Sequence, residues 1–488
     1  MRSGPPDVVL VVMDCVRQDL FADQLGSGAL PFLSTVQGEF LRFSKAVAPA
    51  SWTIPSHASL FTGRYPWDHG AHYKGGGVLG PALPTIAEYL RDRGYRTTCL
   101  SANGYVQPGT GLTRGFEQLR WGGDREFFLR FLAQEPSCPS LNGADAAVHA
   151  RLERDSSASP LRVGTMRALS RFTPFCDALN RVGGKVKGAS PAYVGPWIER
   201  EFDRALVDAE RQPVFTFVNL LEAHEPYFAN AGRPIGARDW LAYARTTQVS
   251  EQWTRGEAEP TANDLAWSKR DYLASMQVID ERVGHLVRLL RSHDRWDRTL
   301  FVLTSDHGQT FGEGGRMYHR LNLQEEITRI PLWVKFAGAE GRSPGTDDRS
   351  WVSLVDLPTT IARSVEPSGA FGDPESVPLQ AADRAPNRTV YSLTDGVGPS
   401  EGESLPAARR ETLDRVQIAG YRGSFKSIVD QSGTEYHFRL TRSGATLVAP
   451  DDREFDAAAF ADIGLKLRTV LDQRTPTSVS QRIAGWGY

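Results

Sequence analysis

The chain has 488 residues, of which 40% are hydrophobic and 23% charged, with a net charge of −2 and a pI of about 6.6. This length and composition are typical of a globular protein with one large domain and a smaller one. Because the charge is nearly balanced, the sequence gives no electrostatic reason to expect binding to nucleic acid or to an acidic membrane surface.

Apolar runs rich in β-branched residues predict the strands of a buried sheet. The first is Asp7–Met13 (DVVLVVM), and similar runs follow at residues 97–100, 214–221 and 300–304. Continuous apolar runs of this kind are typical of strands that are covered on both faces.

Helical patterns lie between these runs. Residues 84–93 open on a proline, which suits the first turn of a helix, and they stop before Gly94. Residues 271–291 have apolar side chains at helical spacing. This alternation predicts an α/β fold with helices on both faces of a mostly parallel sheet. Ligand groups gather at the carboxyl ends of such strands, where we expect Asp14 and Asp306.

Two irregular segments interrupt the alternation. Residues 122–194, rich in Arg, Ser, Ala and Pro, predict a partly helical insertion near the entrance of a site. Residues 366–386 carry many turn-forming residues and predict a linker. We therefore predict a large domain at residues 1–365 and a small α+β subdomain at residues 387–488. Its expected strands and closing helix are residues 390–393, 416–421, 425–429, 436–440 and 455–471.

Four separated patches carry candidate chemistry, and two of them lie near the N-terminus. In the first, Val8–Asp19, the carboxylate of Asp14 ends a strand; alone, such a residue is more often a helix cap. In the second, Ala50–Gly70 (ASWTIPSHASLFTGRYPWDHG), Thr53 opens a Thr-Ile-Pro-Ser-His run that leads to Thr-Gly-Arg. Taken alone, Thr53 would be a turn residue.

The other two patches follow later strands. In Phe217–Tyr227, a strand is followed by His224 in a His-Glu-Pro-Tyr sequence; a structural hydrogen-bonding role is the alternative. In Thr299–Gly315, a strand leads into Ser-Asp-His-Gly, which contains Asp306 and His307. Further on, His319 precedes Glu-Glu and Thr-Arg-Ile-Pro, and it is either a site residue or an exposed loop histidine.

Together and in this order, the patches resemble the sulfatase-like family of the alkaline phosphatase superfamily, over about two thirds of the chain, Asp7–Val334. The resemblance implies an alkaline-phosphatase-like three-layer sandwich and an ester hydrolase activity. It implies contacts of His224 and His319 with the ester or the leaving group, one of them as proton donor. It also implies that one divalent cation is held by Asp14, Thr53, Asp306 and His307.

Oxygen-rich ligation with a single imidazole favours Mn²⁺, Mg²⁺ or Ca²⁺, with Zn²⁺ as an alternative. Two-metal phosphatases of the superfamily have additional Asp and His ligands. No second full set of such ligands stands out in the sequence, so we expect one cation.

The sequence departs from the sulfatase pattern where sulfatases carry formylglycine. Thr53 replaces the Cys or Ser that is oxidised to this aldehyde, and His57 replaces the arginine that stabilises it. The expected Lys-x-His is absent, which leaves Asn103 as a neutral substrate contact. A second acid that many sulfatases have beside the metal aspartate is replaced by Cys15.

These departures favour a metal-dependent hydrolase of phosphate mono- or diesters that uses Thr53 directly as nucleophile. Arg64, His57 and Arg17 are expected to add positive charge around the substrate, although the two arginines equally suit structural ion pairs. The alternatives are a sulfuric ester hydrolase, a soluble phosphotransferase and, last, a metal-binding module without catalysis. The expected substrate is a small-molecule, glycan-type or lipid-type ester, and the oligomeric state stays open.

Neither the cysteines nor the N-terminus points to export. The four cysteines, Cys15, Cys99, Cys138 and Cys176, lack metal-ligand spacing and the density of a disulfide framework. We see no signal peptide and no apolar run near the roughly 20 residues that span a bilayer. We therefore expect a cytoplasmic protein without a membrane span.

Overall fold

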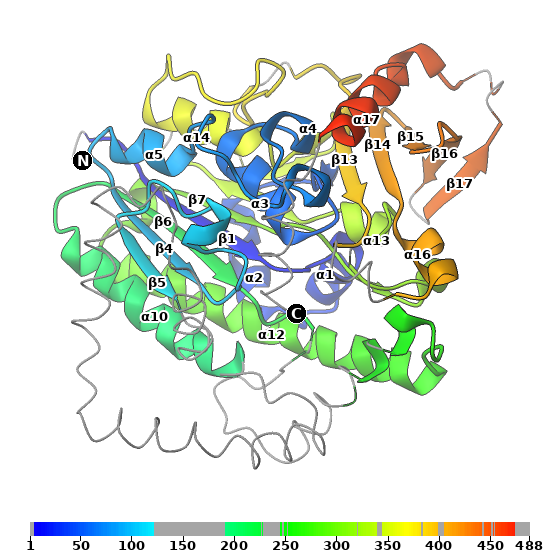
Figure 1. Cartoon of the computed structure of the whole chain (residues 1–488). Coiled ribbons are helices and arrows are strands. Elements are labelled where there is room, and N and C mark those ends of the chain that lie inside the picture. Colours follow the sequence, from blue (N-terminus) through cyan, green and yellow to red (C-terminus); the bar gives the residue numbers. More distant parts are fainter. Residues whose placement is uncertain are drawn as a thin grey trace, which may run out of the picture.

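The structure is a computed structural model of the whole chain (Figure 1). It describes residues 4–121, 191–225, 227, 245, 248–250, 252–319, 321–338, 344–381, 384–398, 405–441, 444–449, 452 and 454–473. Most of the predicted insertion, residues 122–190, lies outside the described residues, and its last residues begin helix α10, Pro191–Asp208.

An eight-stranded sheet forms the centre of the molecule, in the order β11-β2-β10-β7-β1-β6-β4-β5. Strand β10 is antiparallel to both of its neighbours, and every other pair in the sheet is parallel. The mostly parallel sheet predicted from the apolar runs is therefore confirmed. Its strands in chain order are β1 (Asp7–Met13), β2 (Leu41–Phe43), β4 (Arg96–Ser101), β5 (Gln118–Trp121), β6 (Val214–Leu220), β7 (Thr299–Thr304), β10 (Leu332–Lys335) and β11 (Gly345–Asp347).

Helices cover both faces of this sheet. Successive side chains of the central strand β1 point to opposite faces, so they pack against different helices. Val8, Leu10 and Val12 of β1 pack into one core with α3 (Thr53–Thr62), α5 (Ile86–Arg91) and α14 (Asp356–Val365). The alternate residues of β1 pack into a second core with α1 (Gln18–Gly26), α2 (Pro31–Val36), α10 and α12 (Ala262–Ser292). Figure 1 shows α3 and α14 on one side of the sheet and α10 and α12 on the other, which is the predicted three-layer sandwich.

Both predicted helices are present, with different ends. Helix α5 begins after Thr85, whose side chain forms a capping box with Glu88. Helix α12 begins well before residue 271, because Thr261 and Asp264 form a second capping box ahead of a more polar first part. The apolar pattern alone located only the part of α12 that packs against the sheet.

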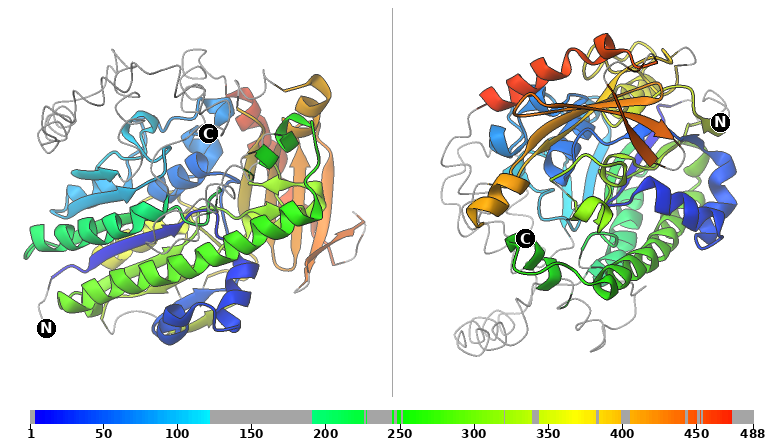
Figure 2. Two further views of the ribbon diagram at one scale, coloured as in Figure 1. Left: turned by 90° about the horizontal axis from the view of Figure 1, so that it is seen from below. Right: turned by 90° about the vertical axis from the view of Figure 1, so that its right-hand side faces the viewer.

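The C-terminal part forms a separate five-stranded antiparallel sheet, coloured yellow to orange-red in Figures 1 and 2. Strands β14 and β15 carry helix α17 (Ile463–Asp472) on one face, through a shared apolar cluster. The last strand was not predicted, because its side chains are mostly exposed and form no long apolar run. The strands are β13 (Val390–Asp395), β14 (Val416–Arg422), β15 (Phe425–Asp430), β16 (Glu435–Thr441) and β17 (Gly444–Val448).

The remaining elements are short, and several of them lie around the site. They are β3 (Ala46–Val47), α4 (Pro66–His69), β8 (Thr310–Phe311), β9 (Met317–Tyr318), α13 (Glu325–Thr328), β12 (Val352–Ser353) and α16 (Ala407–Leu413). The 3-10 turns are at Gln37–Glu39, Tyr73–Gly75, Pro108–Thr110, Trp296–Arg298, Glu313–Gly315 and Ala457–Phe460.

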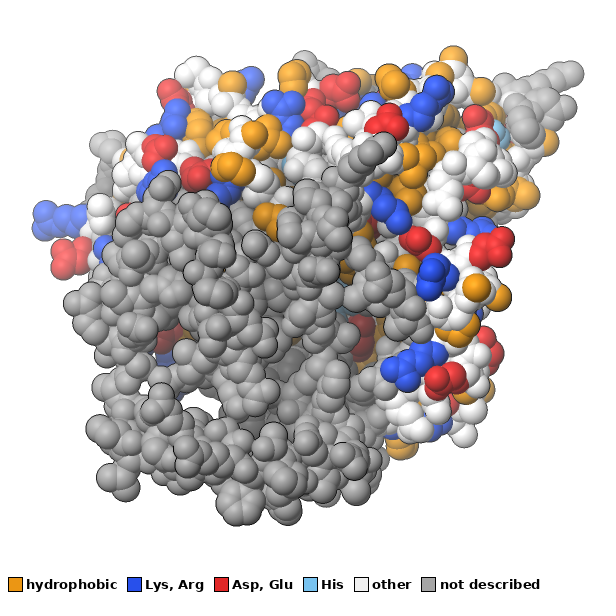
Figure 3. Space-filling view, viewed as in Figure 1, with side chains coloured by type: hydrophobic (Ala, Val, Ile, Leu, Met, Phe, Trp, Pro, Cys, Tyr) orange, Lys and Arg blue, Asp and Glu red, His pale blue; other side chains and the backbone are white. Residues whose placement is uncertain are grey.

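On the side shown in Figure 3, the Lys and Arg side chains of the described residues are interspersed with Asp and Glu. Among the described helices, none has the length and apolarity needed to cross a bilayer.

Candidate metal and ester site

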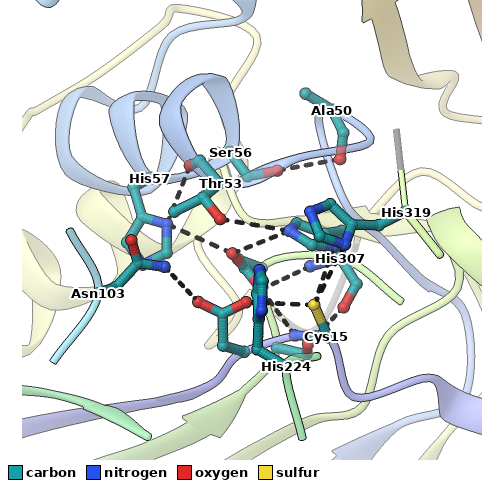
Figure 4. A network of polar contacts seen from close by, with 12 residues as sticks. Cys15, Ala50, Thr53, Ser56, His57, Asn103, His224, His307 and His319 are labelled. Atoms are coloured by element: carbon teal, nitrogen blue, oxygen red, sulfur yellow. Dashed lines mark hydrogen bonds and ion pairs between the residues drawn. The ribbon is translucent and has the colours of Figure 1, made fainter. Parts of the chain in front are cut away.

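The site lies at one edge of the large sheet, where the carboxyl ends of its parallel strands meet. Asp14 follows β1, Asn103 follows β4, His224 follows β6, and Asp306 follows β7. All four side chains are buried. The sheet therefore brings together residues that are up to 292 positions apart in the sequence (Figure 4).

The turn after β1 is held in an unusual conformation by buried hydrogen bonds. Cys15 has a φ of 64°, a left-handed conformation that costs a non-glycine residue about 1–3 kcal/mol. Its backbone N–H donates to Asp306 Oδ1 (3.3 Å), and its carbonyl accepts from the Tyr272 hydroxyl (2.9 Å). The Cys15 thiol lies 3.3 Å from Asp14 Oδ1 and 3.6 Å from His319 Nδ1.

Thr53 is the first residue of helix α3, so its hydroxyl lies at the positive end of the helix dipole. Two contacts fix the approach to this helix: Trp52 Nε1 donates to Asp395 Oδ1 (2.7 Å), and Ser56 Oγ donates to the Ala50 carbonyl (3.0 Å). Thr53 Oγ1 lies 3.4 Å from Nε2 of His307. The predicted nucleophile is thus beside a predicted ligand.

We call Asp14, Thr53, Asp306 and His307 the first donor group. Asp306 Oδ2 lies 3.3 Å from His307 Nε2, and this buried oxygen has no hydrogen-bond partner among the described residues. Two carboxylates, one hydroxyl and one imidazole suit a hard or borderline divalent cation. The residues therefore fit the cation that superfamily members require.

The pKa values of the two carboxylates move in opposite directions. Burial, with the charge of Asp14 in addition, raises the pKa of Asp306 well above its usual range. Burial also opposes ionisation of Asp14, but the neighbouring imidazoles, first His224 and then His307, outweigh it and lower the pKa of that carboxyl. One of the pair therefore favours its protonated form without a cation, and a cation between them would favour ionisation of both.

Burial lowers the pKa of His307 to about 3, with a further contribution from His319. Its imidazole is therefore neutral at pH 7, which is the form that binds metal ions. His57 lies in the same cluster, with Nδ1 3.0 Å from the Thr53 carbonyl and 3.6 Å from Asp306 Oδ2. Burial lowers the pKa of His57 as well, so the positive charge expected from this residue is disfavoured.

Four further donor side chains lie beside the first donor group. The ring of His319 stacks on His307 with centroids 4.6 Å apart, and it contacts the His224 ring at 4.9 Å. Glu225, the residue after His224, places Oε2 3.5 Å from His319 Nδ1. Glu225 was not predicted as a site residue; its only signal in the sequence was an acid directly after a predicted site histidine. Cys15 was expected only as the replacement of an acid, and its thiol lies in the cluster.

The remaining predicted residues have different surroundings from those expected. Asn103 Nδ2 donates to Asp14 Oδ2 (2.7 Å), so the amide supports the carboxylate of a predicted ligand. Arg17 pairs with Asp19 (2.6 Å) and with Glu313 (2.8 Å).

Arg64 is half-buried just beyond the far end of α3, where it pairs with Asp373 (3.2 Å). For Arg64 and Arg17, these ion pairs agree with the structural alternative considered from the sequence.

The C-terminal sheet supports the loop after His307 through the short helix α13. Lys426 of β15 donates to the Leu323 carbonyl and pairs with Glu325 (2.6 Å), and the Tyr421 hydroxyl contacts Thr328 Oγ1 (2.6 Å). On its other side, the α13 backbone accepts hydrogen bonds from Gly308 N (2.7 Å to Ile327 O) and Gln309 N (2.9 Å to Glu326 O). The loop after His307 is therefore tied to the second sheet.

Comparison with known proteins gives a consistent result. A family model described as Sulfatase matches residues 6–365. The chain is 22% identical over 357 residues to iduronate 2-sulfatase of Mus musculus, covering 70% of this chain and 61% of that protein. It is 31% identical over 393 residues to the multifunctional alkaline phosphatase superfamily protein PehA of Trinickia caryophylli, covering 73% of each.

Among solved structures, phosphonate monoester hydrolase of Agrobacterium radiobacter superposes with a TM-score of 0.62 at 18% identity, covering 95% of each chain. At this identity the likeness concerns the fold. The match to the mouse sulfatase spans about three fifths of that protein's length.

Proposed function

Because the chain belongs to the sulfatase family of alkaline phosphatase superfamily hydrolases, we propose that it is a metal-dependent hydrolase of phosphate mono- or diesters with Thr53 as nucleophile. The observation that carries the proposal is the position of Thr53 Oγ1. It lies at the start of α3, 3.4 Å from His307 Nε2, and the same nitrogen lies 3.3 Å from Asp306 Oδ2.

A threonine hydroxyl is a weak nucleophile at neutral pH and needs activation. A cation bound to the first donor group would lower the pKa of this hydroxyl and neutralise the ester oxygens. The start of α3 adds a favourable dipole for the negative charge that forms there.

The proposed reaction has two displacements. Thr53 Oγ forms a bond to phosphorus while the bond from phosphorus to the leaving oxygen breaks, and His224 or His319 protonates the alcohol that departs. Water then attacks the phosphothreonine, which releases phosphate (or the remaining monoester) and restores the hydroxyl. Capture of the intermediate by another alcohol would give a phosphotransferase.

Phosphate is preferred over sulfate because the formylglycine chemistry is missing at several positions together. Thr53 stands at the nucleophile position, and residues 101–103 are Ser-Ala-Asn where sulfatases have Lys-x-His. Asn103 also donates to Asp14, so its amide is engaged with a proposed metal ligand. Sulfuric ester hydrolysis is the second candidate, and the similarity to iduronate 2-sulfatase favours it.

The test compares hydrolysis of an aryl phosphate, a bis-aryl phosphate diester and an aryl sulfate, with and without added Mn²⁺. Thr53→Ala should lower the preferred activity by more than about 1,000-fold, as expected for loss of a nucleophile. Thr62→Ala is the matched control, because Thr62 lies at the other end of α3 and its hydroxyl donates to the Ala58 carbonyl.

Mass spectrometry of quenched turnover mixtures should find a phosphoryl group on the peptide that contains Thr53. Faster cleavage of the sulfate than of both phosphates would overturn the phosphate assignment. Equal activity of wild type and Thr53→Ala would overturn the nucleophile.

A further inference from the structure

We propose that Asp395, in the first strand of the C-terminal sheet, is a positioning residue for the proposed nucleophile Thr53. It acts through Trp52, the residue directly before Thr53 in the chain. The inference rests on the proposed function, because it concerns the hydroxyl that performs the first displacement. Asp395 lies outside residues 6–365, the region that matches the sulfatase model, so this role would belong to the C-terminal subdomain.

The start of helix α3 depends on contacts outside the helix. Most helices begin after a Ser, Thr, Asp or Asn whose side chain accepts a hydrogen bond from the first turn. In α3 this N-cap position is taken by Trp52, which makes no such bond and has an extended backbone, with φ −157° and ψ 170°. The third residue of the helix, Pro55, has no N–H to donate. The direction in which Thr53 enters the helix is therefore set by the contacts that hold Trp52.

Asp395 holds the indole of Trp52 at its edge. Asp395 Oδ1 accepts a 2.7 Å hydrogen bond from Trp52 Nε1, and Asp395 Oδ2 accepts one from the Tyr73 backbone N–H. The Tyr73 ring stacks on the indole, with centroids 4.1 Å apart and an angle of 16° between the planes. One carboxylate thus fixes both the indole and the residue that covers its face. All three side chains are buried, so close packing leaves the indole little room for another rotamer.

The main chain before Thr53 is attached to the same strand. The Ser51 N–H donates to the Leu393 carbonyl, and the Leu393 N–H donates to the Pro49 carbonyl, both at 2.9 Å. Leu393 and Asp395 belong to β13, which pairs along its length with β14. The segment that leads into α3 is therefore joined to the C-terminal sheet through both its main chain and the Trp52 side chain.

A carboxylate suits this position because both of its oxygens accept hydrogen bonds. Asparagine has the same shape, but one of its two terminal atoms is a donor, so Asp395→Asn would set an N–H group against the N–H of Trp52 or of Tyr73. The indole would then shift, and Thr53 would shift with it. A displacement of about 1 Å at a reacting group lowers a rate by about 100-fold.

The experiment compares kcat and KM of full-length Trp52→Phe, Asp395→Asn and the double variant, with the ester that the wild type cleaves fastest. Phenylalanine keeps a ring for Tyr73 to stack on but lacks the indole N–H. Each single change should lower kcat by about 10- to 100-fold and leave KM and the Mn²⁺ dissociation constant within about twofold of wild type. The double variant should be at most about threefold slower than the slower single variant, because both changes remove the same contact.

Trp296→Phe is the matched control. Trp296 Nε1 donates to Glu39 Oε2 at the same distance of 2.7 Å, but Trp296 precedes β7 and lies at the edge of the sheet opposite the site. This variant should keep the kcat and KM of wild type, whatever its stability. Thermal unfolding shows whether each variant is folded, and Trp52→Phe alone decides the outcome if Asp395→Asn does not fold.

A contact that is merely structural would lower the unfolding temperature and leave kcat unchanged. A folded Trp52→Phe protein with kcat within about twofold of wild type therefore overturns the proposal. Additive losses in the double variant, or an equal loss of kcat in Trp296→Phe, overturn it as well. Failure of the proposed function gives a different result. An active Thr53→Ala protein overturns the nucleophile itself, whereas inactive Thr53→Ala beside fully active Trp52→Phe and Asp395→Asn overturns only the positioning role.

Discussion

Replacing Asn103 with alanine should weaken binding of the cation at the first donor group. Asn103 Nδ2 donates a 2.7 Å hydrogen bond to Asp14 Oδ2, and both side chains are buried. Its Oδ1 accepts from the Tyr105 backbone N–H (2.8 Å), so the amide is held in place from both ends. Without it, Asp14 loses a partner that orients the carboxylate toward the other ligands.

The expected size follows from the charge of the acceptor. A hydrogen bond to a charged group contributes about 1.5–3 kcal/mol, which corresponds to about 10- to 100-fold in a dissociation constant. Loss of a residue that orients a metal ligand typically weakens metal binding by about 10- to 100-fold as well. We therefore expect Asn103→Ala to raise the Mn²⁺ dissociation constant by about 10- to 100-fold, and excess Mn²⁺ to restore most of the hydrolysis.

The assay titrates chelator-stripped protein with Mn²⁺ against a fluorescent competitor, and thermal unfolding shows whether each variant is folded. Asn219→Ala is the graded control, because Asn219 Nδ2 lies 3.5 Å from the same Asp14 oxygen, at the limit of a hydrogen bond. It should have the smaller effect. An Asn103→Ala protein within twofold of wild type, or a larger effect at Asn219, would refute this reasoning.

Two further predictions concern stability. Arg388 makes a two-pronged ion pair with the fully buried Asp356 (2.6 and 2.7 Å), so Arg388→Met should lower the free energy of unfolding by about 3–5 kcal/mol in urea titrations; a loss under 1 kcal/mol would contradict this. Burial lowers the pKa of Lys335 to about 8, from its ordinary value of 10.5. Between these two pH values the unfolded chain binds more protons at Lys335 than the folded chain does. The free energy of unfolding therefore rises with pH in this range. From pH 7.5 to 9.5, the unfolding free energy of wild type should rise by about 2 kcal/mol relative to Lys335→Met. A constant difference, or one of opposite sign, would show that the pKa is not shifted this way.

The main parts of the fold and the first donor group were predictable because their signals are local. Asp14, Asp306 and His307 each directly follow an apolar strand, so the sequence that forms the strand also places the ligand. Parallel strands then bring these ends to one edge of the sheet.

The less predictable features depend on partners far away in the chain. The direction of the Asn103 amide is set by Asp14, and the ion pair of Arg64 is set by Asp373, 309 residues further on. Cys15 points into the site because Tyr272, on a helix of another layer, accepts and donates hydrogen bonds at its turn. These contacts could not be predicted from the spacing of residues in the sequence.

The contacts between the C-terminal sheet and the loop after His307 determine where the chain can be cut for expression. A chain cut after residue 365 would keep every predicted ligand and the whole region that matches the sulfatase model. It would lose Tyr421 and Lys426, and with them the side-chain contacts that hold α13 against the loop after His307. Such a fragment would contain the full set of site residues without the support that positions them, so catalytic fragments of this enzyme should extend through β15.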